Sequence, residues 1–124
     1  MTKPLIKVAV KTRYVANASK EEKQRFAFAY TVTIANDGEQ AAQLLNRHWR
    51  ITDATNAVQE VQGAGVVGEQ PRILPGKSYT YSSGSVLKTD VGTMEGSYEM
   101  QTDSGDKFTV KIPVFSLIRP QSLH

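Results

Sequence analysis

The feature of this chain that most constrains its fold is an alternation of apolar and polar residues with a period of two. Successive side chains of a β-strand point to opposite faces, so such a run predicts a strand with one buried face. Two long runs, over 6–14 and 26–34, show the pattern clearly. Shorter runs that predict further strands lie over 45–51, 79–81, 94–100 and 108–112.

Turn-forming residues separate these runs at the spacing typical of a sandwich. Asn, Asp, Gly and Pro supply the backbone angles and local hydrogen bonds that tight turns require. Seven to eight short strands joined by such turns predict an antiparallel β-sandwich. We therefore expect an all-β, immunoglobulin-like fold in which residues 1–124 form a single domain. The turn clusters lie at 36–38, 53–56, 75–76, 90–92 and 103–106.

Two local features sharpen this expectation. The segment 73–79 has the pattern of a tyrosine corner, in which the Tyr79 hydroxyl would bond to backbone just upstream and fix a crossover between sheets. Trp49 takes the place of a sandwich's core tryptophan, and together these features resemble the fibronectin type III arrangement. Arg47 shares the parity of Trp49, so we expect it at an open strand end or beside a bulge.

The composition limits both the chemistry and the compartment. The chain has no cysteine, which excludes disulfides, thiolate nucleophiles and Cys-ligated zinc. Lys7 and Lys11 interrupt the apolar character of the N-terminal segment, so we expect no secretory signal. The uncharged run 26–36 is too short to span a bilayer. We therefore expect a cytoplasmic protein that does not insert into membranes.

The charge and the aromatic content of the basic surface do not indicate a nucleic-acid partner. The formal net charge is only +3. Lys7, Lys11 and Arg13 form a basic stripe on the outer face of the first predicted strand. The stripe could dock an acidic partner or a phosphate backbone, or it could protect an edge strand from pairing. The aromatic side chains that stack on bases are absent from this face.

A Gly-rich segment matches the pattern G-x-G-x-x-G of dinucleotide-binding folds, where glycines let the backbone approach a pyrophosphate before a helix. Pro71 follows almost at once, so no helix can form here. Two hypotheses remain: a loop or bulge in which backbones crowd, or a nest of amides that binds an anion. The candidate ligand- or partner-binding residues are Gly63, Gly65, Gly68, Gln70 and Arg72, in or beside the Gly-rich loop 62–71.

A succession of residues along essentially the whole chain points to a family more specifically than the Gly-rich pattern does. It comprises Phe28-x-Tyr30 with Val32 and Asn36, Leu44-Leu45 with Trp49-x-Ile51, the segment 60–71, Pro75-Gly76 with Tyr79-x-Tyr81, Gly92-Thr93-Met94 with Gly96, Tyr98 and Met100, and Ile112-Pro113-x-Phe115. This succession resembles the bacterial ApaG family, also called CorD. The resemblance implies a fibronectin type III-like sandwich, a link to cobalt resistance and magnesium efflux, and no established catalytic residue. It also implies a domain that recurs in a eukaryotic F-box protein and a polymerase-delta-interacting protein as a protein-interaction module.

The implied link to cobalt prompts a search for metal ligands. The histidines are His48 and His124, and there is no His-x-His pair and no acidic loop of the calcium type. Glu95 and Glu99 share one strand face, but about 13 Å separates them, which is too far to chelate one ion without another strand. We therefore predict no metal site and no cofactor.

The sequence also lacks a catalytic arrangement. A catalytic histidine needs an orienting acid and a nucleophile, whereas Asp53 has the opposite parity to His48 and 82–85 is not a nucleophile elbow. We predict a non-enzymatic protein-binding or adaptor module with an unidentified protein partner, and homodimers by strand addition are possible. The alternative is a small-ligand module that binds phosphate, nucleotide or a divalent metal weakly, through the Gly-rich loop in the anion case.

Overall fold

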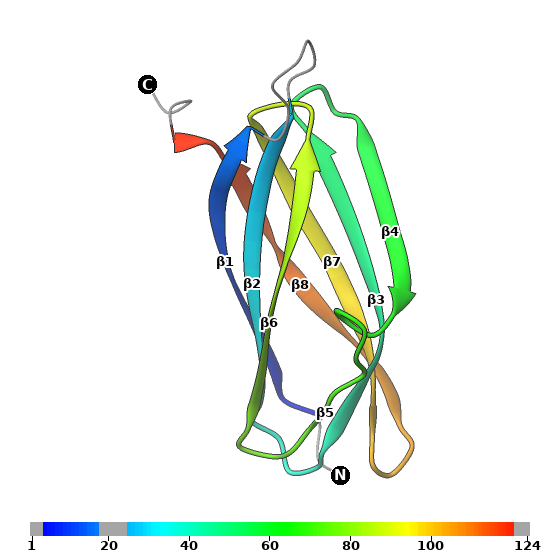
Figure 1. Ribbon diagram of the computed structural model, residues 1–124. Helices are drawn as coiled ribbons and strands as arrows, with labels where there is room; N and C mark the ends of the chain where they lie inside the picture. The colour runs from blue at the N-terminus through cyan, green and yellow to red at the C-terminus, as the bar shows by residue number, and fades with distance from the viewer. Residues whose placement is uncertain (1–3, 18–24, 121–124) are drawn as a thin grey trace.

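The computed structural model describes residues 4–17 and 25–120, which form eight antiparallel strands in two sheets (Figure 1). This confirms the predicted all-β sandwich. Within these residues, no helical segment has the length and apolar character that crossing a membrane would need. The strands are β1 (Ile6–Asn17), β2 (Phe26–Asn36), β3 (Ala42–Asp53), β4 (Val58–Ala64), β5 (Arg72–Ile73), β6 (Ser78–Leu87), β7 (Val91–Thr102) and β8 (Lys107–Ile118).

The strand order leaves one side of the sandwich open. One sheet has the order β1-β2-β6, and the other has the order β4-β3-β7-β8, with β5 paired to the start of β3. This is the expected fibronectin type III-like arrangement. β1 and β8 contact each other at one side, and β6 and β4 end the sheets at the other side (Figure 1). Within the described residues β6 pairs with β2 and β4 pairs with β3, so each has one free edge.

The inner faces of the two sheets supply the core. In β2 every second residue from Phe26 to Asn36 is buried, as the alternation predicted. Trp49 of β3 is 3% exposed and lies between the sheets, which confirms its predicted role. Its ring makes edge-on contacts with Tyr30 of the facing sheet and with Tyr98 and Phe115 of its own sheet, at centroid distances of 5.5, 6.4 and 5.8 Å.

A bulge in β3 explains the parity of Arg47. The pairing of β3 with β7 shifts at Leu45, which is an extra residue in β3. The Leu45 carbonyl accepts hydrogen bonds from the Gly65 amide (2.9 Å) and from Gln70 Nε2 (2.8 Å) instead. Arg47 follows the bulge on the same inner face as Trp49. The prediction that Arg47 lies beside a bulge is therefore confirmed.

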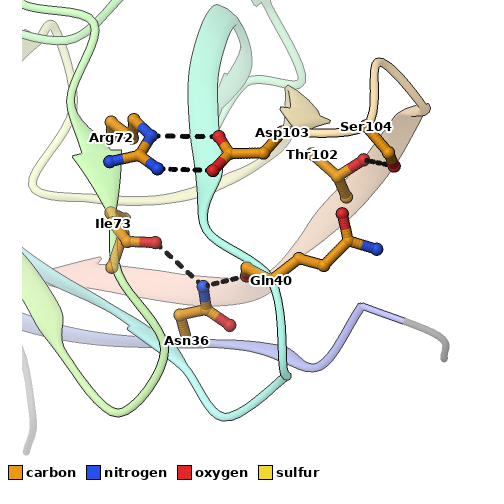
Figure 2. Close-up of polar contacts among 7 residues, drawn as sticks. All are labelled: Asn36, Gln40, Arg72, Ile73, Thr102, Asp103 and Ser104. Atoms are coloured by element: carbon orange, nitrogen blue, oxygen red, sulfur yellow. Dashed lines mark hydrogen bonds and ion pairs between the residues drawn. The ribbon is translucent and has the colours of Figure 1, made fainter.

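A buried asparagine holds the crossover from one sheet to the other. The chain crosses between β5 and β6, which pair in different sheets. Asn36 is 1% exposed, and its Nδ2 donates to the carbonyls of Gln40 (2.8 Å) and Ile73 (2.9 Å), as Figure 2 shows. Its Oδ1 accepts from the amide of Gly38 at 2.9 Å, and its own carbonyl accepts from the Gly76 amide at 2.8 Å. One side chain thus satisfies three separate backbone groups.

The tyrosine corner is only partly as predicted. The turn at 75–76 does carry a crossover between sheets. The hydrogen bonds of the described residues do not, however, include one from the Tyr79 hydroxyl to the backbone. The ring of Tyr79 lies beside that of Tyr81, at 6.3 Å. The carbonyl just upstream, that of Ile73, is already taken by Asn36.

The basic stripe lies on an edge strand. β1 ends its sheet, and Lys7, Lys11 and Arg13 are exposed on it. Lys7 forms an exposed ion pair with Asp37, with Nζ and Oδ2 3.5 Å apart. This placement favours the hypothesis that the lysines protect a free edge from pairing.

Replacing Asn36 should destabilise the fold strongly. Asn36→Ala leaves two carbonyls and one amide without their partner, so we expect the free energy of unfolding to fall by about 3 kcal/mol. Asn36→Asp keeps the acceptor for Gly38 but loses both donated bonds, and it should also destabilise. Urea unfolding at neutral pH would measure both. Gln40→Ala is the control, because Asn36 contacts only the Gln40 main chain; an Asn36→Ala protein as stable as this control would contradict the assignment.

Candidate functional site

The segment predicted as a Gly-rich loop over 62–71 is partly a strand. β4 runs on to Ala64, which corrects the predicted boundary. Gly63 lies within β4, opposite Arg47 of β3. A Cβ atom at Gly63 would lie 3.0 Å from Arg47 Nη1. The glycine therefore leaves room for the guanidinium group, which lies over the strand.

The other two glycines belong to a tight turn. Gly65 and Gly68 have φ angles of 66° and 83°, in the left-handed region that favours glycine. A Cβ at Gly65 would lie 2.2 Å from the Glu69 carbonyl oxygen. The amides of Gly65, Val66 and Glu69 donate to the carbonyls of Leu45, Glu69 and Val66, respectively. Because these amides are used in the turn, the geometry favours a crowded loop over an anion nest.

Gln70 and Arg72 make contacts of different kinds. Gln70 Nε2 donates to the carbonyl at the β3 bulge. Arg72 of β5 forms a two-bond ion pair with Asp103 in the β7–β8 turn (Figure 2). The hydrogen bonds of this pair lower the pKa of Asp103 and raise the pKa of Arg72. The predicted candidate residues therefore do not form one site. The glycines and Gln70 lie near Leu45 and Arg47, whereas Arg72 pairs with Asp103 elsewhere.

A groove runs along the open side of the sandwich, between β6 of one sheet and β3–β4 of the other. Three hollows of about 190, 340 and 360 Å³ follow each other along it. Neighbouring hollows share walls, so we treat them as one groove. Its loop end borders the turn 66–69, and its far end borders Arg25 and Lys88. The shared walls are Tyr30, Arg47, Trp49 and Ser83 between the first two hollows, and Ile51, Gln59 and Val86 between the last two.

The groove has an aromatic floor and an apolar rim. Tyr30 and Trp49 line its floor. Three valines that border it, Val58, Val67 and Val86, are 45, 54 and 48% exposed. Apolar side chains that gather on an exposed surface around a concave site mark places where a partner binds.

Val67 is held in an unfavourable backbone conformation at the loop end. Its φ is 42°, which is rare for a β-branched residue. Hydrogen bonds of 2.7 and 2.9 Å between Val66 and Glu69 close the turn around it, in a position that Asn or Gly usually takes. Strain of this kind collects at functional sites. Here the strained residue, Val67, also presents an apolar side chain to the groove.

Tyrosine hydroxyls form the polar interior beside the loop end. The hydroxyls of Tyr81 in β6 and Tyr98 in β7 share a hydrogen bond that joins the two sheets. Burial raises the pKa of Tyr30 and of Tyr98, and it raises the pKa of Tyr81 to about 12. These phenols therefore stay neutral at any physiological pH, and Arg47 is the charged group among them.

A separate hollow, of about 490 Å³ and not part of the groove, lies on the outer face of the larger sheet and includes His48, Ser97 and Glu99. His48 Nε2 lies 2.7 Å from Glu60 Oε1, and this hydrogen bond lowers the pKa of Glu60. Ser97 is opposite His48 in the register of β3 and β7. No hydrogen bond joins Ser97 to His48 in the part of the chain that the structure describes. His48 has an acid beside it but no activated nucleophile.

The residues 4–17 and 25–120 hold no group of three or more His, Cys, Asp or Glu side chains that could bind a metal ion. Glu99 accepts a hydrogen bond from Asn46 Nδ2 at 2.6 Å. His124 lies outside the described residues. The arrangement therefore offers no cage for a divalent cation within this part of the chain.

Sequence reasoning missed the groove. Tyr30 and Trp49 were expected to be core residues, and they are buried, but one side of each also lines the groove. The available signal was Arg47, a cation at an inward-facing position of a strand. Such a residue needs an opening at which its charge reaches solvent or a partner.

Comparison with known proteins gives a consistent assignment. The family model described as the ApaG domain matches residues 16–102. Protein ApaG of Pseudomonas fluorescens is 56% identical, over 96% of this chain and 94% of its own. Protein ApaG of Pseudomonas aeruginosa is 57% identical, over 99% and 98%. A crystal structure described as the putative ApaA protein from Bordetella pertussis has a TM-score of 0.90 and 45% identity, over 95% of this chain and 96% of its own.

The buried tyrosines should make stability fall at high pH. The pKa of Tyr81 is raised from 10.0 to about 12 in the folded protein. The unfolded chain therefore loses its phenolic proton first, so this contribution to stability is complete below pH 10 and is lost as the pH rises towards 12. We expect the ionisation of Tyr81 alone to lower the free energy of unfolding by about 2 kcal/mol across this interval.

Urea unfolding as a function of pH would measure this loss. Tyr81→Phe/Tyr98→Phe removes both hydroxyls and leaves no unpaired partner, so its stability should fall less steeply above pH 10. Tyr79→Phe is the matched control outside the pair. An equally steep fall in the double variant would show that other groups cause it.

Proposed function

This chain belongs to the ApaG family, and on that premise we propose that it acts as a non-enzymatic module that binds another protein through the groove between β4 and β6. The observation that carries the proposal is the groove itself: an aromatic floor and exposed valines lie between two free strand edges. Free edges can pair with an added strand, and apolar hollows beside them can take its side chains. An extended segment of a partner fits this combination.

The resemblance to the family also implies a part in cobalt resistance and magnesium efflux. In our proposal such an effect passes through the bound partner rather than through a metal on this protein. The basis is that the described residues bring no three metal-ligating side chains together.

A small-ligand role is the second candidate. It has one observation in its favour, the position of Arg47 against Gly63 and Gly65, which places a cation beside the Gly-rich segment. Amide shifts of Gly63, Gly65 and Gly68 during titration with pyrophosphate would test it. Saturable shifts confined to this segment would support it.

Selection from a random-peptide display library would test the protein-binding proposal. Peptides enriched on the whole protein should bind saturably and shift the amide signals of groove residues such as Val61 and Ser83. Val86→Asn should weaken their binding at least about tenfold, because it removes an apolar contact and places a polar amide on the rim. Val114→Asn is the matched control, since Val114 is 60% exposed on β8, away from the groove.

Three outcomes would count against this proposal. A failure to enrich any peptide would contradict it, and so would equal sensitivity to the two asparagine substitutions. Shifts in the groove that depend only on protein concentration would instead indicate that a second copy of the chain pairs there.

A further inference from the structure

We infer that the groove selects an extended acidic segment, in which an aspartate or glutamate side chain pairs with Arg47. This inference rests on the proposed function and specifies the chemistry of the partner.

Backbone carbonyls fix the position of Arg47. Its Nη1 donates to the carbonyls of Ala64 (3.1 Å) and Gly65 (3.0 Å), and the missing side chain at Gly63 leaves space beside it. These bonds hold the guanidinium in one orientation but supply no negative charge. The ion pairs within residues 4–17 and 25–120 do not include Arg47.

Arg47 retains hydrogen-bond donors for a ligand. Among the described contacts, its hydrogen bonds use Nη1 alone. Nε and Nη2 form the edge of a guanidinium that binds a carboxylate with two parallel hydrogen bonds. A guanidinium already fixed by backbone carbonyls loses little freedom when it binds, which favours a carboxylate at this point.

Basic side chains outnumber acidic ones along the groove. Arg47, Arg25 and Lys88 border it, and Asp53 is the acid among its lining residues. The Asp53 carboxylate accepts hydrogen bonds from Thr55 and from the Ala57 amide. The lining is therefore positive overall, which attracts an acidic segment and disfavours a basic one.

The groove also imposes a spacing on the side chains of a bound segment. Arg47 borders both the loop-end hollow and the middle hollow, whose walls include Trp49, Val61 and Ile51. In an extended chain, side chains two positions apart point the same way and lie about 7 Å apart. A carboxylate at Arg47 thus places the side chain two positions away against the apolar part of the middle hollow's wall. The expected pattern is an acidic and an apolar residue separated by one residue, in the order set by the direction in which the segment binds.

The test is a double-mutant cycle on the display-selected peptides. Replacing the acidic residue of the peptide by its amide, Glu→Gln or Asp→Asn, should weaken binding to the wild-type protein by about tenfold or more. Arg47→Gln should weaken binding of the acidic peptide similarly, and the peptide substitution should then have little further effect. Raising the salt concentration should weaken most the pair in which both charges are present.

Two further protein variants test where the peptide binds. Arg25→Gln removes a cation from the far end and should have a smaller effect than Arg47→Gln. Val67→Asn suits the left-handed turn better, so it should raise the unfolding temperature while weakening peptide binding by removing an apolar contact. The peptide-side substitution leaves the protein unchanged, so the result does not depend on how well any variant folds.

The outcomes separate this inference from the proposed function. Peptides that bind in the groove without an acidic residue, or whose amide forms bind equally well, overturn the inference and leave the binding module standing. Binding that requires a phosphorylated residue also overturns it in favour of a phosphate reader. If no peptide binds in the groove, both proposals fall.

Discussion

The packing of Trp49 between the two sheets is the contact on which the rest of this structure depends. Its ring meets Tyr30 across the interior and Tyr98 and Phe115 within its own sheet. Large aromatic side chains in such contacts contribute more than their buried area alone. Because one side of Trp49 also lines the groove, the same residue supports the core and forms the floor of the proposed binding site.

Polar groups placed between the sheets give the sandwich its particular geometry. The Tyr81–Tyr98 hydrogen bond joins one sheet to the other, and Asn36 ties the β2–β3 connection at Gln40 to β5 at Ile73. A buried polar group stabilises a fold only where its partners are in place. These contacts therefore fix how the sheets meet, and with it the width of the open side where Arg47 lies.

The open side shows a compromise between stability and binding. Two free strand edges and three half-exposed valines are features that a protein without a partner would avoid. The backbone of Val67 is strained in a turn that Asn or Gly would make more easily. Each feature costs stability, and all of them border one groove, which is consistent with a surface shaped by a partner.

The fold class, much of the core and the family follow from the amino-acid sequence alone. Period-two runs define a strand and its buried face without knowledge of its neighbours, so β2 and Trp49 were predictable. Even the bulge was signalled by the parity of Arg47. The groove was not, because it depends on which strands end the two sheets, and that is set by pairing between distant segments. Likewise, Gly63 could be recognised as space for Arg47 only once β3 and β4 were in register. Local patterns decide what each segment becomes, and tertiary pairing decides which side chains meet at an opening.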